Sequence, residues 1–299
     1  MMPELGIARE NTVLISGIGC SSRFPYYVNA YGMHSIHGRA TAIASGLAST
    51  REDLAVFVIT GDGDALSIGG NHLIHLLRRN VNVTILLFNN CIYGLTKGQY
   101  SPTSEIGKMT SSTPFGSIDQ PFNPISLALG AEATFVARAL DSDKKGLSSV
   151  LTAAAKHRGA SLVEIYQNCP IFNDGAFDSL KGADGTSNLI PLQDGDPIVF
   201  AGGELCVTRN ASGSLEVSET ASVDPDSILI HDSANPDPSI AFALSRITGK
   251  TPIGIFRSVT RPSYDDELRR QIKVSAGFRA NTDEDLQIML DGKDCWVVN

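Results

Sequence analysis

Short apolar runs alternate with helical patterns through the first third of the chain. Residues 12–16, 54–60 and 81–88 are mostly apolar, whereas 37–49 and 67–80 carry apolar residues at helical spacing. Strands that are apolar on both faces are typical of a sheet that helices cover on both sides. The order strand, helix, strand, helix, strand therefore predicts parallel βαβ units.

The pattern continues less regularly to about residue 170. Residues 124–129 and 142–157 are predicted helices, and 161–166 is a predicted strand. Between residues 89 and 122, glycine, serine, threonine and proline accumulate without a clear period. A loop of this length inside a compact domain is usually functional.

Together these segments predict an α/β fold with a mainly parallel sheet flanked by helices. We assign this fold to residues 1–172. A polar and glycine-rich stretch follows from residue 173, and we assign residues 173–299 to a C-terminal arm.

The composition excludes several classes of protein. Of the 299 residues, 42% are apolar and 19% are charged, which is typical of a globular protein and not of a disordered or coiled-coil one. The net charge of −8 argues against a nucleic acid as partner. No apolar run approaches the ~18 residues of a membrane span, and residues 1–6 show no secretory signal. We expect a cytoplasmic protein that binds neither a membrane nor a nucleic acid.

The cysteines do not form the pattern of a disulfide framework. They are few, odd in number and widely spread, at Cys20, Cys91, Cys169, Cys206 and Cys295. This usage is typical of a reducing compartment.

Two polar motifs follow neighbouring predicted strands. Gly61-Asp62-Gly63-Asp64 ends one strand, and Asn89-Asn90 ends the next, roughly 25 residues later, so that both lie at the ligand-binding edge of an open α/β sheet. Carboxylate and amide oxygens are ligands that Mg²⁺ prefers. Glycines beside Asp62 let a diphosphate approach the backbone, and the N–H groups at the start of the following helix can complete an anion site.

The first motif has two other interpretations. Gly-Asp-Gly-Asp alone is most often a polar turn after a strand. An EF-hand is disfavoured because the glutamate expected at the end of its loop is missing.

The paired motifs resemble the thiamine-diphosphate signature, in which Gly-Asp-Gly is followed by Asn-Asn at this spacing. The resemblance implies that Asp62, the side chain of Asn90 and the backbone carbonyl of Ile92 hold a Mg²⁺ ion.

A narrower resemblance extends over most of the chain. Five ordered blocks are similar to the β subunits of 2-oxoacid:ferredoxin oxidoreductases, and the Gly-Leu-Thr-Lys-Gly-Gln form of the fourth resembles the 2-oxoglutarate branch. The blocks begin at Gly17, His34, Gly61, Asn89 and Ile253. The resemblance implies a thiamine-diphosphate-binding fold. It also implies a set of residues near that cofactor, namely Ile18, Gly19, Cys20, Ser21, His37, Gly63, Asp64, Gly94 and Leu95.

Three residues are candidates for catalysis. His37 and His72 could contact diphosphate, substrate or intermediate, because imidazole can donate a hydrogen bond or carry a proton near neutral pH. Either histidine could instead only cap a helix or pack. Lys97 could attract the distal carboxylate of a dicarboxylic substrate, pair with an acidic residue of a partner subunit, or simply be a solvated loop lysine.

The family also carries a [4Fe–4S] cluster, which normally needs four thiolates. Cys20 and Cys169 match two of the family positions, whereas Cys91, Cys206 and Cys295 do not. The other two cysteines should form a Cys-x-x-Cys before residue 1. Either the polypeptide is shortened, which we favour, or it is a variant that cannot build the full cluster alone.

The resemblance implies a function that needs several partners. The chain would be the β subunit of a 2-oxoglutarate:ferredoxin oxidoreductase, which converts a 2-oxo acid and CoA to acyl-CoA and CO₂ and reduces ferredoxin. A larger α subunit would supply the rest of the site. The alternatives are a pyruvate or branched-chain 2-oxoacid oxidoreductase subunit, a non-oxidative thiamine decarboxylase subunit, and a subunit that only holds the cofactor or assists assembly.

Overall fold

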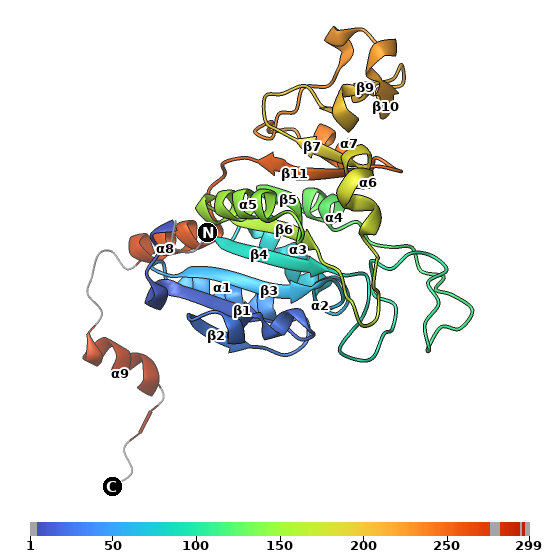
Figure 1. Ribbon diagram of the computed structural model, residues 1–299. Helices are drawn as coiled ribbons and strands as arrows, with labels where there is room; N and C mark the ends of the chain where they lie inside the picture. Colours follow the sequence, from blue (N-terminus) through green and yellow to red (C-terminus); the bar gives the residue numbers. More distant parts are fainter. Residues whose placement is uncertain (1–4, 276–281, 294, 297–299) are drawn as a thin grey trace.

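An eight-stranded sheet forms the centre of the protein (Figure 1). The computed structural model describes residues 5–275, 282–293 and 295–296. The strands lie in the order β2-β1-β3-β4-β6-β5-β11-β7. Their bounds are β1 Thr12–Ser16, β2 Tyr31–His34, β3 Ala55–Gly61, β4 Val83–Asn89, β5 Phe135–Leu140, β6 Ala160–Tyr166, β7 Leu189–Leu192 and β11 Thr251–Ser258.

Neighbouring strands pair in parallel throughout this sheet, except where β11 runs antiparallel to β5. The prediction of a mainly parallel sheet flanked by helices is therefore confirmed.

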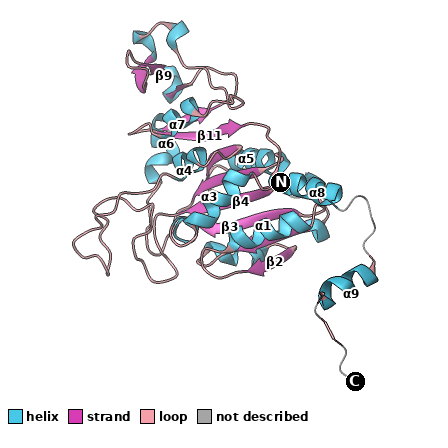
Figure 2. Cartoon of the chain, turned by 180° about the vertical axis from the view of Figure 1, so that it is seen from behind, coloured by secondary structure: helices cyan, strands magenta, loops and turns pink. Residues whose placement is uncertain are grey.

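Helices cover both faces of the sheet (Figures 1 and 2). Val56 and Val58 of β3 belong to a buried cluster shared with one layer of helices, whereas Phe57 and Ile59 belong to a cluster on the opposite face. Burial on both faces explains why the strands are apolar without alternation. The first layer contains α1 (Ala40–Thr50), α3 (Gly70–Arg79), α4 (Pro124–Gly130) and α7 (Ser239–Ser245), and the second contains α5 (Lys144–Lys156).

The helix predicted over residues 67–80 begins three residues later than predicted. A short helix, α2 (Asp62–Leu66), follows β3 directly, and α3 begins only at Gly70. The chain turns between them because Gly69 packs against other backbone: a Cβ atom at Gly69 would lie 2.4 Å from the carbonyl oxygen of Asp64. No larger residue fits that contact.

The segment from residue 173 contributes to the central sheet. β7 and β11 extend the sheet beyond β5, and α8 (Tyr264–Ser275) contacts α1 through a hydrogen bond from Arg269 to the carbonyl of Ala48. A separate three-stranded antiparallel sheet lies beyond β7, and α6 and α9 complete the described helices. Their bounds are β8 Val199–Phe200, β9 Leu205–Arg209, β10 Leu215–Glu219, α6 Gly182–Asn188 and α9 Asp283–Asp291. The boundary at residue 172 stays a prediction.

None of the helices in the described ranges is long and apolar enough to cross a membrane.

Asn80 ties together three parts of the fold. It ends α3 in the left-handed conformation, with a φ of 55°, and is buried. Its Oδ1 accepts hydrogen bonds from Thr134 before β5 and from the N–H of Ala160 in β6, and its Nδ2 donates to the carbonyls of Arg261 and Pro262. Asparagine suits this position because it tolerates a positive φ and offers both a donor and an acceptor.

Replacement of Asn80 by alanine should therefore destabilise the protein strongly. Asn80→Ala leaves buried backbone groups unpaired and places a less tolerant residue at positive φ, so we expect a loss of about 3 kcal/mol in the free energy of unfolding. Urea denaturation measures it. The matched control is Asn71→Ala at an exposed position of α3, which should change stability by less than about 0.5 kcal/mol. Equal effects of the two substitutions would contradict the role of Asn80.

Candidate functional site

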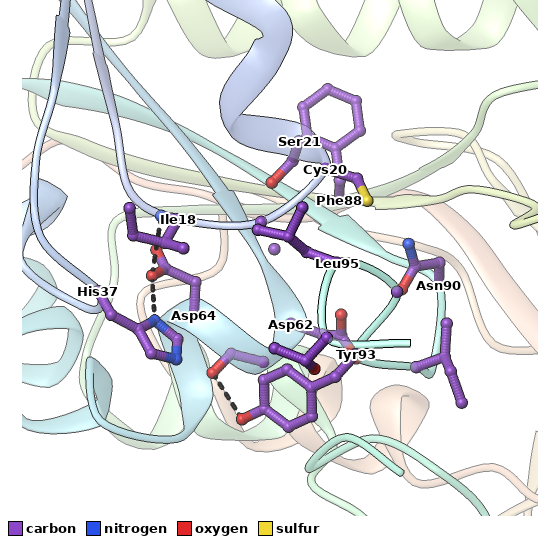
Figure 3. Close-up of a pocket in the computed structure, with 16 residues that line it drawn as sticks. Ile18, Cys20, Ser21, His37, Asp62, Asp64, Phe88, Asn90, Tyr93 and Leu95 are labelled. Carbon is purple, nitrogen blue, oxygen red and sulfur yellow. Dashed lines mark hydrogen bonds and ion pairs between the residues drawn. The ribbon is translucent and has the colours of Figure 1, made fainter. Parts of the chain in front are cut away.

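A pocket lies where β1, β3 and β4 end, at their carboxyl edge (Figure 3). Parallel pairing brings these three ends together, since β3 lies between β1 and β4. The pocket is lined by all the residues predicted for cofactor and magnesium binding, namely Ile18, Gly19, Cys20, Ser21, His37, Asp62, Gly63, Asp64, Asn90, Ile92, Gly94 and Leu95.

Asp64 is buried beneath the pocket and holds three segments together. Its Oδ1 accepts hydrogen bonds from the N–H groups of Ile18, at 3.2 Å, and Gly38, at 2.7 Å. The same oxygen lies 2.6 Å from Nδ1 of His37, and the hydroxyl of Thr60 donates to Oδ2 at 2.7 Å. Because both oxygens are occupied by protein groups, Asp64 supports the pocket wall instead of offering a free oxygen to a ligand.

One ring nitrogen of His37 is held by Asp64, and the side chain is partly exposed. Its Nδ1 faces Asp64, and its side chain is 41% exposed (Figure 3). A carboxylate at one nitrogen sets the tautomer and the orientation of an imidazole. Nε2 of His37 is therefore the ring nitrogen that Asp64 does not contact.

Asp62 is 2% exposed and has an asymmetric environment. The hydroxyls of Ser101 and Thr103 both lie within hydrogen-bonding distance of its Oδ2, at 2.5 and 2.7 Å. In the described residues no side chain donates to Oδ1. Burial raises the pKa of the Asp62 carboxyl, and the hydrogen bonds from Ser101 and Thr103 oppose this shift only in part.

Asn90 provides a second oxygen at the same edge. Its Oδ1 is buried and has no hydrogen-bond partner among the described residues. A buried oxygen without a partner costs free energy and calls for an explanation such as a bound ion. Asp62, Asn90 and the buried Ile92 all line the pocket, so the donor set fits a hard divalent cation.

Gly63 lets the backbone come close to the loop that follows β4. A Cβ atom at Gly63 would lie 2.1 Å from the ring of Tyr93, whose hydroxyl donates to the carbonyl of Gly63 at 3.1 Å. Glycine is required here by close packing as well as by any approach of a diphosphate. Burial raises the pKa of Tyr93, so the phenol stays a donor at neutral pH.

The structure brings neither His72 nor Lys97 to the pocket lining. His72 lies in the first turn of α3 and is half-buried. Lys97 is exposed at the tip of a tight turn, where its φ is 76° and its N–H donates to the carbonyl of Gly94. A positive φ at a residue other than glycine is uncommon and is often found at functional loops.

Cys20 and Cys169 both lie close to Gly94. Both sulfur atoms are within 4 Å of the point where a Cβ atom on Gly94 would be. These two cysteines are 149 residues apart in the sequence, but in the fold both lie beside the pocket. Within the described ranges, no group of three or more histidine, cysteine, aspartate or glutamate side chains could hold a metal ion.

Sequence reasoning missed several residues of the site. Ser101 and Thr103 bond to Asp62, Asn89 accepts a hydrogen bond from Thr103, and Tyr93 packs against Gly63. The loop between residues 89 and 122 was predicted to be functional, but its composition has no period that singles out these positions.

Comparison with known proteins agrees with this geometry. Residues 17–165 match the family model described as "Thiamine pyrophosphate enzyme, C-terminal TPP binding domain". The chain is 63% identical to the 2-oxoglutarate oxidoreductase subunit KorB of Mycobacterium tuberculosis, over 100% of this chain and 81% of the relative. It is 34% identical to the β subunit of 2-oxoacid:ferredoxin oxidoreductase 2 of Aeropyrum pernix, over 97% and 84%.

A solved structure is also similar. The 2-oxoglutarate:ferredoxin oxidoreductase from Magnetococcus marinus, solved with 2-oxoglutarate, coenzyme A and succinyl-CoA bound, matches with a TM-score of 0.76 and 35% identity. The match covers 97% of this chain and 86% of the solved one.

Fold and site together define a thiamine-diphosphate-binding subunit of an enzyme. Relatives that match over nearly the whole chain identify the family within this class. The chain belongs to the β subunits of the 2-oxoacid:ferredoxin oxidoreductases.

The partly buried Cys91 and the exposed Cys295 should differ in reactivity. Burial raises the pKa of the Cys91 thiol to about 12, so at pH 8 only on the order of one thiol in ten thousand is the reactive thiolate. We expect iodoacetamide to label the exposed Cys295 in the native protein, and Cys91 only after denaturation in urea. Peptide mass spectrometry measures both. If Cys91 were labelled as fast as Cys295 in the native protein, the environment described for Cys91 would be wrong.

Proposed function

We propose that this chain is the β subunit of a 2-oxoglutarate:ferredoxin oxidoreductase. With its α subunit it would convert 2-oxoglutarate and CoA to succinyl-CoA and CO₂, and the electron pair released would pass to ferredoxin. The observation that carries this proposal is the buried Oδ1 of Asn90, which no described residue contacts through a hydrogen bond and which lies with Asp62 in a pocket at the carboxyl edge of the sheet. The relatives named for 2-oxoglutarate support the choice of substrate.

Asp62, the side chain of Asn90 and the carbonyl of Ile92 would hold Mg²⁺, which would in turn bind the diphosphate of the cofactor. Thiamine diphosphate supplies a thiazolium that accepts the electron pair left when the 2-oxo acid loses CO₂. The protein groups that line the pocket would bind and orient the cofactor. The proposed lining includes Ile18, Gly19, Ser21, Gly63, Gly94 and Leu95.

His37 would carry a proton or donate a hydrogen bond close to the reacting centre. Asp64 holds its Nδ1, so Nε2 is the atom available for this work. His72 would have to act from the first turn of α3, outside the pocket lining, which makes it the weaker of the two candidates.

Cys20 and Cys169 would be two thiolate ligands of a [4Fe–4S] cluster. Their support is the position of both sulfur atoms beside Gly94, next to the pocket. A cluster there would lie close to the cofactor and could pass electrons toward ferredoxin. All five cysteines are free thiols, which fits the cytoplasm as the place of action.

The α subunit would cover the open side of the pocket. Leu95 lines the pocket and is exposed, and the long loop after β4 exposes three more large apolar side chains, Met109, Phe115 and Ile118. Exposed apolar side chains that lie together on a surface mark a protein interface. A partner docked there would exclude water from the cofactor.

Replacement of Asp62 tests the metal site. Asp62→Asn keeps the shape of the side chain and removes its charge, so we expect thiamine diphosphate to bind at least 100-fold more weakly in the presence of Mg²⁺. Isothermal titration of the subunit complex measures the affinity. The control Asp53→Asn alters an exposed carboxylate and should have no effect.

The melting temperature of Asp62→Asn shows whether the variant is folded. Because burial raises the pKa of Asp62, the charged carboxylate opposes folding at pH values above its ordinary pKa. The cofactor-free variant should therefore melt no lower than the wild type. Tight cofactor binding by Asp62→Asn would refute the assignment.

Lys97 can be tested through substrate choice. The subunit complex, reconstituted with thiamine diphosphate, Mg²⁺, CoA and ferredoxin, should turn over 2-oxoglutarate with a kcat/KM at least tenfold above that for pyruvate or a branched-chain 2-oxo acid. If Lys97 binds the distal carboxylate, Lys97→Met should raise the KM for 2-oxoglutarate about tenfold, the value of one charge-assisted hydrogen bond. The KM for pyruvate, which has no such group, should not change.

Two results would argue against these assignments. Equal changes of KM for both substrates would remove Lys97 from substrate recognition. Release of CO₂ without reduction of ferredoxin would favour a subunit that holds the cofactor but lacks a working cluster.

A further inference from the structure

A continuous chain of buried polar groups leads from Asp62 away from the pocket and through the centre of the sheet. The hydroxyl of Thr103 lies 2.7 Å from Oδ2 of Asp62 and 2.8 Å from Oδ1 of Asn89. The amide of Asn89 donates to Oε1 of Glu164 at 2.8 Å. Nε of Arg138 donates to the other oxygen of Glu164, also at 2.8 Å. All five side chains are buried, and we call them the polar chain.

The far end of the polar chain is rigidly held. Nη1 of Arg138 donates to the carbonyl of Pro252 in β11, and the guanidinium lies 5.0 Å and 5.6 Å from the ring centres of Tyr166 and Phe256. Burial is the largest single influence and lowers the pKa of Arg138, but the attraction and hydrogen bond of Glu164, together with Tyr166, outweigh it and the net shift is upward. The guanidinium therefore stays charged beside Glu164.

The chemistry of Glu164 determines how Asn89 is oriented. A carboxylate can only accept from an amide, so the Nδ2 end of Asn89 faces Glu164 and the Oδ1 end faces the opposite way. There Oδ1 accepts from the N–H of Cys91 at 3.2 Å and lies beside the hydroxyl of Thr103. The single hydrogen of Thr103 is then placed between two acceptors, Asn89 and Asp62.

We propose that Glu164 is a positioning residue for the metal site: through Asn89 and Thr103 it fixes the orientation of Asp62 and so determines which oxygen remains available to a divalent cation. Neither Glu164 nor Arg138 lines the pocket. Two strands of the central sheet, β5 and β6, thus act on a site that they do not touch. The inference rests on the proposed magnesium site and adds to it the residues that orient its carboxylate.

The test is a double-mutant cycle on the affinity for Mn²⁺, which replaces Mg²⁺ and is detected by electron paramagnetic resonance. The protein is the complete subunit complex with thiamine diphosphate. Glu164→Gln and Thr103→Val should each weaken Mn²⁺ binding at least tenfold, as is usual for groups that orient a metal ligand. The double variant should bind no more weakly than the weaker single variant, because either substitution breaks the same polar chain.

The matched control is Glu105→Gln, which makes the same chemical change at an exposed position of the same loop as Thr103. It should leave the Mn²⁺ affinity unchanged. Far-UV circular dichroism checks that each variant is folded. If Glu164→Gln does not fold, Glu164→Asp makes the same test: it keeps the negative charge beside Arg138 but is one methylene shorter, and should also weaken Mn²⁺ binding.

Two outcomes would overturn the inference while the metal site stands. One is unchanged Mn²⁺ affinity in a folded Glu164 variant, and the other is a double variant whose loss is the product of the two single losses. Failure of the wild-type complex to bind Mn²⁺ would instead overturn the magnesium site itself, and this inference with it.

Discussion

The pocket depends on the buried carboxylate of Asp64. It accepts hydrogen bonds from groups that follow β1 and β2 and from Thr60 near the end of β3, so two loops and a strand that are separate in the sequence share one hydrogen-bonding partner. A buried carboxylate is tolerated only when its oxygens are satisfied. The loops therefore adopt the one arrangement that satisfies Asp64, and this arrangement builds the pocket wall and orients His37.

Asp62 and Asp64 divide two tasks between them, although only Gly63 separates them. Asp64 is bonded at both oxygens and serves the fold, whereas Asp62 has side-chain donors at Oδ2 alone. Next to it, the buried Oδ1 of Asn90 has no hydrogen-bond partner among the described residues. Natural proteins leave buried polar groups unsatisfied mainly at functional sites, which is why this oxygen supports the assignment of a cation site.

The sequence predicted the strands that local pattern determines. The predicted strand over residues 12–16 has the bounds of β1, and β3, β4 and β6 differ by no more than two residues at either end, because burial on both faces produces continuous apolar runs. β5 was missed since it carries Arg138, a charged residue that is buried only because Glu164 in β6 neutralises it. No local pattern reveals such a pairing. No local pattern reveals the place of β11 either, because it pairs with β5 from more than a hundred residues further along the chain.

The sequence also predicted only part of the candidate site. The glycine, aspartate and asparagine motifs identified the residues at the carboxyl edge because a chemical function and a strand end coincide there. Ser101 and Thr103 could not be identified, since their roles arise from the path of a long loop back to Asp62. The roles of His72 and Lys97 stay predictions from the chemistry of their side chains.

If the proposed site is correct, this edge of the sheet holds a divalent cation together with a diphosphate. Electron–nuclear double resonance of the complex with Mn²⁺ and thiamine diphosphate measures whether the two are in contact. We expect ³¹P couplings from the cofactor diphosphate to Mn²⁺, and loss of the bound Mn²⁺ signal in Asn90→Ala. A bound Mn²⁺ without ³¹P coupling, or an unchanged spectrum in Asn90→Ala, would contradict it.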